Sequence, residues 1–164
     1  MLETPRLVLT SWLASDVDDL LEVHSDPETM RFVRHGRPES RDEVAALIAE
    51  YLEQDELTGV TKWRLADRSG RLLGRAGFGS HTADGTPGHE LGYTIRRDQW
   101  GQGIATEIAA ALVDWHRRHA GDTPLWATVV MDNHASARVL TKVGFEPADT
   151  VDHHGRECLH FRLP

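Results

Sequence analysis

Residues 95–106 read IRRDQWGQGIAT, and this short stretch holds the strongest signal in the chain. A strand-like run ends at Ile95, two glycines follow at positions 101 and 103, and a helical pattern begins. Glycines let a backbone approach a ligand closely, and the unbonded N–H groups of a helix start attract anions. The stretch predicts a phosphate-binding loop, although a turn that only tightens the chain is the alternative. It lacks the Gly-Lys-Ser/Thr of a P-loop, and Thr106 stands where a dinucleotide fingerprint needs glycine or alanine.

Segments of strand and helix character alternate on both sides of this loop, which predicts an α/β or α+β domain. Upstream, residues 6–10 alternate polar and apolar as a half-buried strand does. Ser15 precedes several acidic residues and predicts a helix start. Ser40 with Glu43 forms a capping box, which predicts a helix running to about Gln54.

The segment between that helix and the loop has strand character. Residues 60–66 and 72–80 flank a turn at 67–70, residues 81–88 read as a loop, and 89–95 as a further strand. Glycine within a strand often marks a bulge or a close backbone approach. The strand 72–80 carries three such residues: Gly74, Gly77 and Gly79.

Beyond the loop, the pattern predicts two helices and three strands. The helices cover about 103–120 and 135–143, each followed by a glycine suited to a C-cap. The strands cover residues 126–131, 145–151 and 157–163, with the last turn near His154-Gly155.

Length and charge restrict the function classes. The chain has 164 residues, about one domain's worth, and a formal net charge of −8. That charge argues against a nucleic-acid partner or an anionic membrane surface and suits a cationic amine. No secretory signal or spanning segment is visible, and a single cysteine, Cys158, fits a reducing compartment, so a cytoplasmic protein is expected.

A second motif, DNHASARVLTKVGF at residues 132–145, narrows the choice of phosphate ligand. Together the two motifs resemble the GCN5-related N-acetyltransferase (GNAT) superfamily. The family's acetyl-CoA loop reads Gln/Arg-x-x-Gly-x-Gly/Ala, and its later motif reads Asn-x-x-Ala-x-x-x-Tyr-x-Lys-x-Gly-Phe. This chain departs from them at Trp100, Ser136 and Leu140.

Those departures are similar to the branch of ribosomal-protein N-terminal acetyltransferases, the RimJ/RimL-like proteins. Four segments match that branch: residues 3–9, 25–30, 90–93 and 100–107. The resemblance covers nearly the whole chain and implies a single GNAT domain over residues 1–164. It implies a mixed, strongly twisted central sheet that is splayed at the cofactor strand and flanked by helices.

The resemblance also implies how acetyl-CoA would be held. The pantetheine arm would lie along the backbone of Thr94 and Ile95, as in β-strand addition. Asn133 would hydrogen-bond the arm, although a helix N-cap is an equally natural role for it. The pyrophosphate would lie on the loop backbone, at Gly101, Gln102, Gly103, Ile104, Ala105 and Thr106.

Acetyl transfer to an amine needs a group that accepts the amine proton and an acid for the leaving thiolate. The family's usual acid is the tyrosine that Leu140 replaces, and in the resembled branch the serine at Ser136 is the proposed acid. A hydroxyl bonded to its own helix backbone is the alternative. Glu90 is the candidate base, and a solvated surface acid is the alternative. By pKa alone three histidines compete with it: His24, His81 and His89. No metal site is expected.

The function expected from the resemblance is acetyl-CoA-dependent N-acetylation of a primary amine by direct attack in a ternary complex, since no partnered nucleophile suggests a covalent intermediate. The acceptor could be a protein N-terminal amine. Alternatives are a small amine such as an aminoglycoside or polyamine, transfer of succinyl or another acyl group, and a CoA-binding sensor without catalysis. A homodimer is the oligomeric state to test first, because dimers are commonest among soluble proteins.

Overall fold

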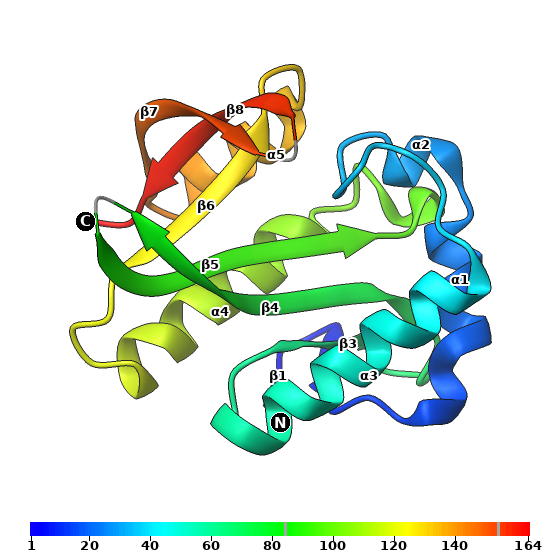
Figure 1. Cartoon of the computed structure of the whole chain (residues 1–164). Coiled ribbons are helices and arrows are strands. Elements are labelled where there is room, and N and C mark those ends of the chain that lie inside the picture. The colour runs from blue at the N-terminus through cyan, green and yellow to red at the C-terminus, as the bar shows by residue number, and fades with distance from the viewer. Residues whose placement is uncertain (84, 154) are drawn as a thin grey trace. The chain divides into compact units, whose positions relative to one another are not determined.

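The computed structural model describes residues 1–83, 85–153 and 155–164. Its eight strands in those ranges form one sheet in the order β1-β2-β3-β4-β5-β6-β8-β7 (Figure 1). The strands are β1 (Leu2–Glu3), β2 (Leu7–Thr10), β3 (Lys62–Asp67), β4 (Leu72–Ala83), β5 (Thr86–Ile95), β6 (Leu125–Val130), β7 (Glu146–His153) and β8 (Arg156–Arg162). The helices are α1 (Val17–His24), α2 (Pro27–Met30), α3 (Arg41–Thr58), α4 (Ile104–His119) and α5 (His134–Lys142), with short 3-10 turns η1 (Ala14–Asp16) and η2 (Arg97–Gln99).

The chain divides into two compact units. The first contains residues 1–77 and 93–102, and the second contains residues 78–92 and 103–164. Strands β4 and β5 each begin in one unit and end in the other. The predicted α/β architecture with a mixed sheet and helices is confirmed: β5 and β6 pair in parallel, whereas β2 and β3, and β6 and β8, pair antiparallel.

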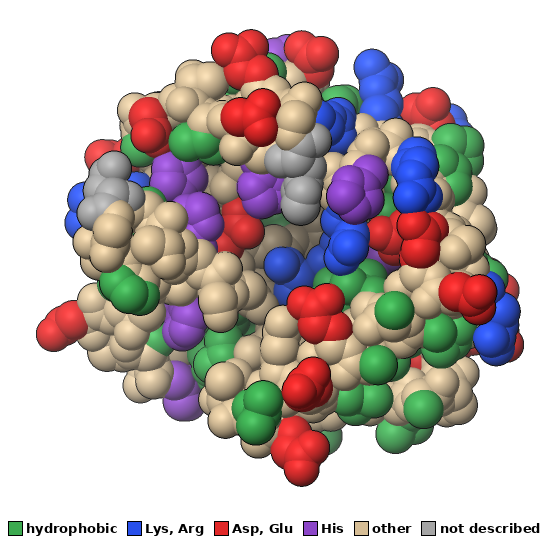
Figure 2. Space-filling view, viewed as in Figure 1, with side chains coloured by type: hydrophobic (Ala, Val, Ile, Leu, Met, Phe, Trp, Pro, Cys, Tyr) green, Lys and Arg blue, Asp and Glu red, His purple; other side chains and the backbone are tan. Residues whose placement is uncertain are grey.

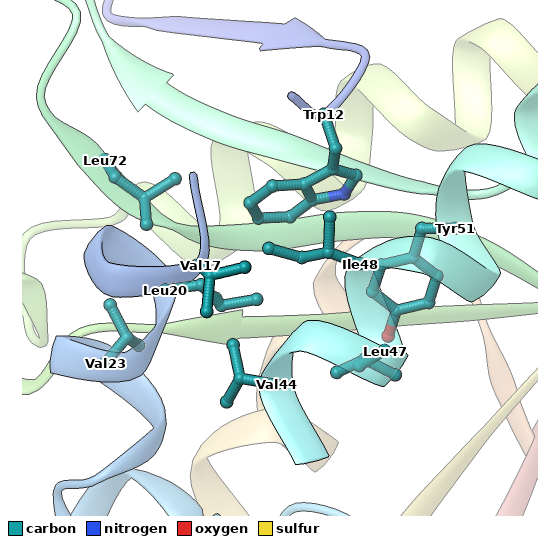
Figure 3. Close-up of a cluster of buried hydrophobic side chains, with 9 residues drawn as sticks. All are labelled: Trp12, Val17, Leu20, Val23, Val44, Leu47, Ile48, Tyr51 and Leu72. Carbon is teal, nitrogen blue, oxygen red and sulfur yellow. The ribbon is translucent and has the colours of Figure 1, made fainter. Parts of the chain in front are cut away.

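The first unit is held together by an apolar cluster between α1, α3 and the start of β4 (Figure 3). Trp12 and Tyr51 stack within it, with ring centroids 6.3 Å apart. Burying each large side chain contributes about 1.5–3 kcal/mol. The other members project into the same space: Val17, Leu20, Val23, Val44, Leu47, Ile48 and Leu72.

The capping box at the start of α3 is confirmed. Ser40 Oγ accepts from the Glu43 N–H at 3.3 Å, and Glu43 Oε2 accepts from the Ser40 N–H at 2.8 Å. The helix continues four residues past the predicted end and stops at Gly59, whose φ of 67° suits glycine. The prediction that Ser15 caps the first helix is wrong, because Asp16 precedes α1 and Ser15 lies in η1.

Two glycines of β4 confirm the predicted close backbone approaches. A Cβ on Gly74 would lie 1.9 Å from the Thr94 carbonyl oxygen, and one on Gly77 would lie 2.1 Å from the Thr61 carbonyl oxygen. A register shift between Leu65 and Ala66 accompanies the first of these contacts. The end of β5 therefore lies closer to β4 than any side chain would allow.

The second unit corrects the loop predicted at residues 81–88. Here β4 extends to Ala83 and β5 already begins at Thr86, so His81 is a strand residue. Thr82, Gly85 and Pro87 made this segment look like a loop, but the two strands continue almost to their hairpin turn. The predicted turn near His154-Gly155 lies partly outside the described residues, because His154 is not among them.

Candidate active site

The glycine loop has the backbone shape that the sequence predicts. Gly101 and Gly103 have φ values of 73° and 77°, a region that other residues rarely adopt. The first hydrogen bond of α4 runs from the Glu107 N–H to the Gly103 carbonyl at 3.0 Å. The N–H groups of Ile104, Ala105 and Thr106 therefore precede the helix's own bonding pattern and remain free for an anion.

Trp100 fixes the approach to this loop, at the position where the chain departs from the family's first motif. Its indole Nε1–H donates to the Ile95 carbonyl at 2.8 Å. The Gln102 amide donates to the Asp98 carbonyl at 3.0 Å, and the Gln102 carbonyl accepts from Arg6 at 2.8 Å. Three side-chain hydrogen bonds thus hold residues 100–102 of the loop in place.

Thr94 and Ile95, the predicted partners of the pantetheine arm, are the last two residues of β5 and are both buried. One lone pair of the Ile95 carbonyl is already used by Trp100. In the pairing that joins β5 to β6, only His89–Leu125 and Glu90–Trp126 are partners, although β5 continues to Ile95. The splay expected at the cofactor strand stays a prediction.

Asn133 and Ser136 lie at the start of α5. Asn133 Oδ1 accepts from the Ser136 N–H at 3.2 Å, so the predicted N-cap role of Asn133 is confirmed. The half-buried Ser136 hydroxyl makes no hydrogen bond to any described residue, whereas Thr141 Oγ1 in the same helix donates to the Ala137 carbonyl at 3.1 Å. The alternative of a serine bonded to its own helix backbone is not observed.

Glu90 is half-buried and pairs with Trp126 across the β5–β6 bridge. Paired residues project to the same side of a sheet, so both side chains lie on one face. His81 and His160 also lie there, with ring centroids 5.2 and 6.3 Å from that of Trp126. We call this the Glu90 face. Within the described ranges no hydrogen bond or ion pair joins Glu90 to Ser136.

Two of the three histidines that compete with Glu90 as the base make hydrogen bonds to other side chains. His24 is fully buried in the first unit, where its Nδ1 lies 2.8 Å from Glu39 Oε2. His89 Nδ1 lies 3.1 Å from His116 Nε2, and burial lowers the pKa of both rings, that of His116 to about 4. His81 is left as the histidine beside Glu90, and sequence reasoning missed its place because it assigned the residue to a loop.

Other predicted features are placed as follows. Cys158 is buried on β8. Trp12 is in the core, whereas Phe32 and Trp63 are only half-buried. Residues 1–83, 85–153 and 155–164 contain no group of three or more His, Cys, Asp or Glu side chains placed for a metal ion. In the same ranges no helix is long and apolar enough to cross a membrane.

These features define an α/β domain with a glycine loop that opens a helix, a serine whose hydroxyl makes no hydrogen bond to the described residues, and a carboxylate on a separate strand. The family model described as an acetyltransferase (GNAT) domain matches residues 6–146. The chain belongs to this family of acetyltransferases and is an enzyme of the transferase class.

Individual relatives agree with this assignment. The uncharacterized N-acetyltransferase YoaA of Bacillus subtilis is 28% identical over 147 residues, which are 89% of this chain and 82% of YoaA. A Bordetella pertussis protein assigned to the GnaT acetyltransferase family has a similar structure, with a TM-score of 0.84, 22% identity and coverage of 99% and 98% of the two chains. RimL, a ribosomal L7/L12 alpha-N-protein acetyltransferase solved with coenzyme A, has a TM-score of 0.81, 16% identity and coverage of 97% and 94%. These structural likenesses show the fold.

Proposed function

We propose that this protein transfers the acetyl group of acetyl-CoA to a primary amine, and that the acceptor is the N-terminal amine of a protein. Family membership supports the acetyl donor. The observation that carries the proposal is the half-buried hydroxyl of Ser136, which makes no hydrogen bond to the described residues and lies at the start of α5, one turn before the buried Leu140. The fold likeness to RimL supports a protein N-terminus as acceptor.

Acetyl-CoA would supply a thioester with a good leaving group and a pyrophosphate for anchoring. The N–H groups of Ile104, Ala105 and Thr106 would hold the pyrophosphate, with Gly101, Gln102 and Gly103 shaping the approach. Hydrogen bonds of this charge-assisted kind contribute about 1.5–3 kcal/mol each. The left-handed conformations of Gly101 and Gly103 and the free helix N–H groups are the observations that fit such a ligand.

The pantetheine arm would run along the end of β5, where backbone groups of Thr94 and Ile95 would bond it. The Asn133 side chain uses its carbonyl oxygen for the N-cap, and its amide NH₂ makes no hydrogen bond to any described residue. That NH₂ could donate to the arm while the oxygen continues to cap α5. Both roles anticipated for Asn133 are compatible for this reason.

In the reaction the neutral amine attacks the thioester carbon, so that a C–N bond forms and the C–S bond breaks. Ser136 would give its hydroxyl proton to the leaving sulfur and recover one from the acceptor nitrogen. We place the proton-accepting role at Glu90, reached directly or through an intervening group. Of three protons on the starting ammonium, one stays on the amide, one ends on the thiol and one is released to solvent.

The test is a thiol-release assay with acetyl-CoA and four acceptor sets: peptides with free N-termini, N-terminally blocked peptides with a lysine, polyamines and aminoglycosides. We expect turnover with the first set, and a fall in kcat of roughly 100-fold in Ser136→Ala. Thr141→Ala, which removes another hydroxyl of α5, is the matched control and should leave kcat unchanged. Turnover confined to polyamines or aminoglycosides would overturn the acceptor, and a fully active Ser136→Ala would overturn the acid.

A further inference from the structure

The Glu90 face carries more polar groups than the proposed chemistry has used. Strand pairing places Trp126 beside Glu90, Thr128 beside His160, and His160 beside Asp149. Residues two apart in one strand share a face, so Trp126 and Thr128 both project to this side. Four strands of the second unit therefore contribute side chains to this face, and Figure 2 shows several histidine side chains on the side of the molecule that it displays.

His160 is oriented by a carboxylate and left with one unused nitrogen. The ring is 5% exposed, and its Nδ1 lies 3.0 Å from Asp149 Oδ1. Asp149 accepts, so Nδ1 carries the hydrogen, and in the neutral ring Nε2 is then an acceptor. Nε2 and the neighbouring Thr128 Oγ1 are both buried, and neither has a partner among the described residues. The Thr128 hydroxyl can donate or accept, whereas the bare Nε2 can only accept, so this nitrogen is the atom that suits a ligand N–H.

His81 lies next to this pair, on β4. Its ring centroid is 5.1 Å from that of His160, and its nitrogens make no hydrogen bond within the described residues. Burial lowers the pKa of His81, Glu90 raises it, and His160 and His153 lower it. The ring is therefore neutral at pH 7, open to a donor, and close enough to Glu90 for the carboxylate to stabilise its charged form.

We propose that His81 is the group that takes the proton from the acceptor amine, with Glu90 stabilising the imidazolium that forms and His160 Nε2 accepting a hydrogen bond from the same amine. This proposal rests on the proposed function, and it names His81 as the group between the acceptor amine and Glu90. The site contains acceptors and a carboxylate, which is the complement of an ammonium group with its three donors. The proton moves from the ammonium nitrogen to a His81 ring nitrogen, which is the intervening group of the proposed mechanism, and then through the Glu90 carboxylate to solvent.

The first experiment compares pH profiles of kcat/KM for the whole enzyme with the best amine acceptor from the thiol-release assay. His81→Ala should lower kcat/KM by about 100-fold, in the usual range for a lost general base. Added imidazole should restore part of that loss in His81→Ala. The matched control His119→Ala removes an exposed histidine stacked on Trp115, and it should behave like the unaltered enzyme with or without imidazole.

Glu90→Gln gives an independent readout, because the Glu90 charge raises the pKa of His81. In this variant the acidic limb of the kcat/KM profile should move to lower pH, and the His81 ring should titrate at lower pH by NMR without any acceptor present. His81→Gln is a second variant in case the alanine variant folds poorly.

Two results would overturn the inference. One is a His81→Ala enzyme within about threefold of the unaltered enzyme, and the other is an acidic limb that stays in place in Glu90→Gln. Failure of the proposed function is distinguishable, because it would leave the unaltered enzyme without turnover on any amine.

Discussion

Two histidine pairs lie on opposite faces of the sheet in the second unit, and their surroundings differ. His89 and His116 bond each other at 3.1 Å beneath Phe78, whose ring centroid is 5.4 Å from that of His116. On the Glu90 face, His81 and His160 lie 5.1 Å apart by centroid and do not bond each other. The first pair is enclosed by aromatic side chains, whereas the second is flanked by carboxylates.

We infer that the His89–His116 pair has a structural role and that the His81–His160 pair has a chemical one. Aromatic packing and mutual bonding leave His89 and His116 neutral and satisfied, as the depressed pKa of each indicates. His160 instead has a buried Nε2 without a hydrogen-bond partner among the described residues, and this atom is the one that the proposed acceptor amine would bond. Substitution of His116 should therefore affect stability, and substitution of His81 or His160 should affect catalysis.

The largest stability effect should come from Phe78, which is fully buried against His89, Trp115 and His116. We expect Phe78→Ala to lower the free energy of unfolding by about 3–5 kcal/mol, because it leaves a cavity under the ring pair. Phe78→Leu, which refills most of the volume, should cost much less. Urea unfolding measures both, and equal losses would contradict the packing role.

A smaller effect is expected at Gly88, which lies under the ring of Trp126. A Cβ there would lie 2.2 Å from Trp126 Cζ3 and 2.6 Å from the Pro124 carbonyl oxygen. Gly88→Ala should destabilise by about 1–3 kcal/mol and shift the indole on the Glu90 face. Thermal unfolding and near-ultraviolet circular dichroism would report the two consequences, and a variant with an unchanged aromatic signal would show that the ring does not depend on this glycine.

The helix-side pair predicts a pH dependence of stability. Burial holds the pKa of His116 at about 4, below its ordinary value of 6.5, so the unfolded chain binds more protons between those values. Stability from this group is fully present above about pH 6.5 and is lost as pH falls toward 4. We expect a loss on the order of 1 kcal/mol after solvent screening. His116→Gln should reduce the slope of unfolding free energy against pH, and an unchanged slope would assign it to other groups.

The smallest effect should come from Thr128, whose buried Oγ1 has no partner in the described part of the chain. Thr128→Val keeps the shape and removes the unsatisfied hydroxyl. We expect the unfolding free energy to stay the same or rise by up to about 1 kcal/mol. Differential scanning calorimetry would measure it, and a clear fall in Tm would mean that the hydroxyl is bonded in solution.

Local signals in the sequence predicted the elements well. The Ser40–Glu43 box, the glycine loop at 101–103 and the strand alternation over residues 6–10 each depend on neighbours in the chain, so one sequence suffices to identify them. Ser136 and Asn133 were found through the motif at residues 132–145, and their helix start was predicted correctly.

The Glu90 face could not be predicted in the same way, because it depends on register between strands. Asp149 lies opposite His160 because His153 pairs with Arg156 at the hairpin end, and each following residue of β7 pairs with the next residue of β8 until Asp149 meets His160. The hairpin turn was predicted near 154–155, and counting back from it could have suggested this pair. The strand position of His81 was not predicted for another reason. Its neighbours favour turns, but pairing between strands overrode that local preference.

The most direct test of the account is kcat/KM at about pH 7.5 for His160→Gln and His116→Gln, measured where circular dichroism shows both variants folded. The account predicts a loss of about tenfold or more for His160→Gln, the value of a lost hydrogen bond to a charged group. It predicts a change within about twofold for His116→Gln, whose defect should appear in stability instead. Equal losses of kcat/KM in the two variants, or a larger loss in His116→Gln, would contradict the assignment of the chemistry to the Glu90 face.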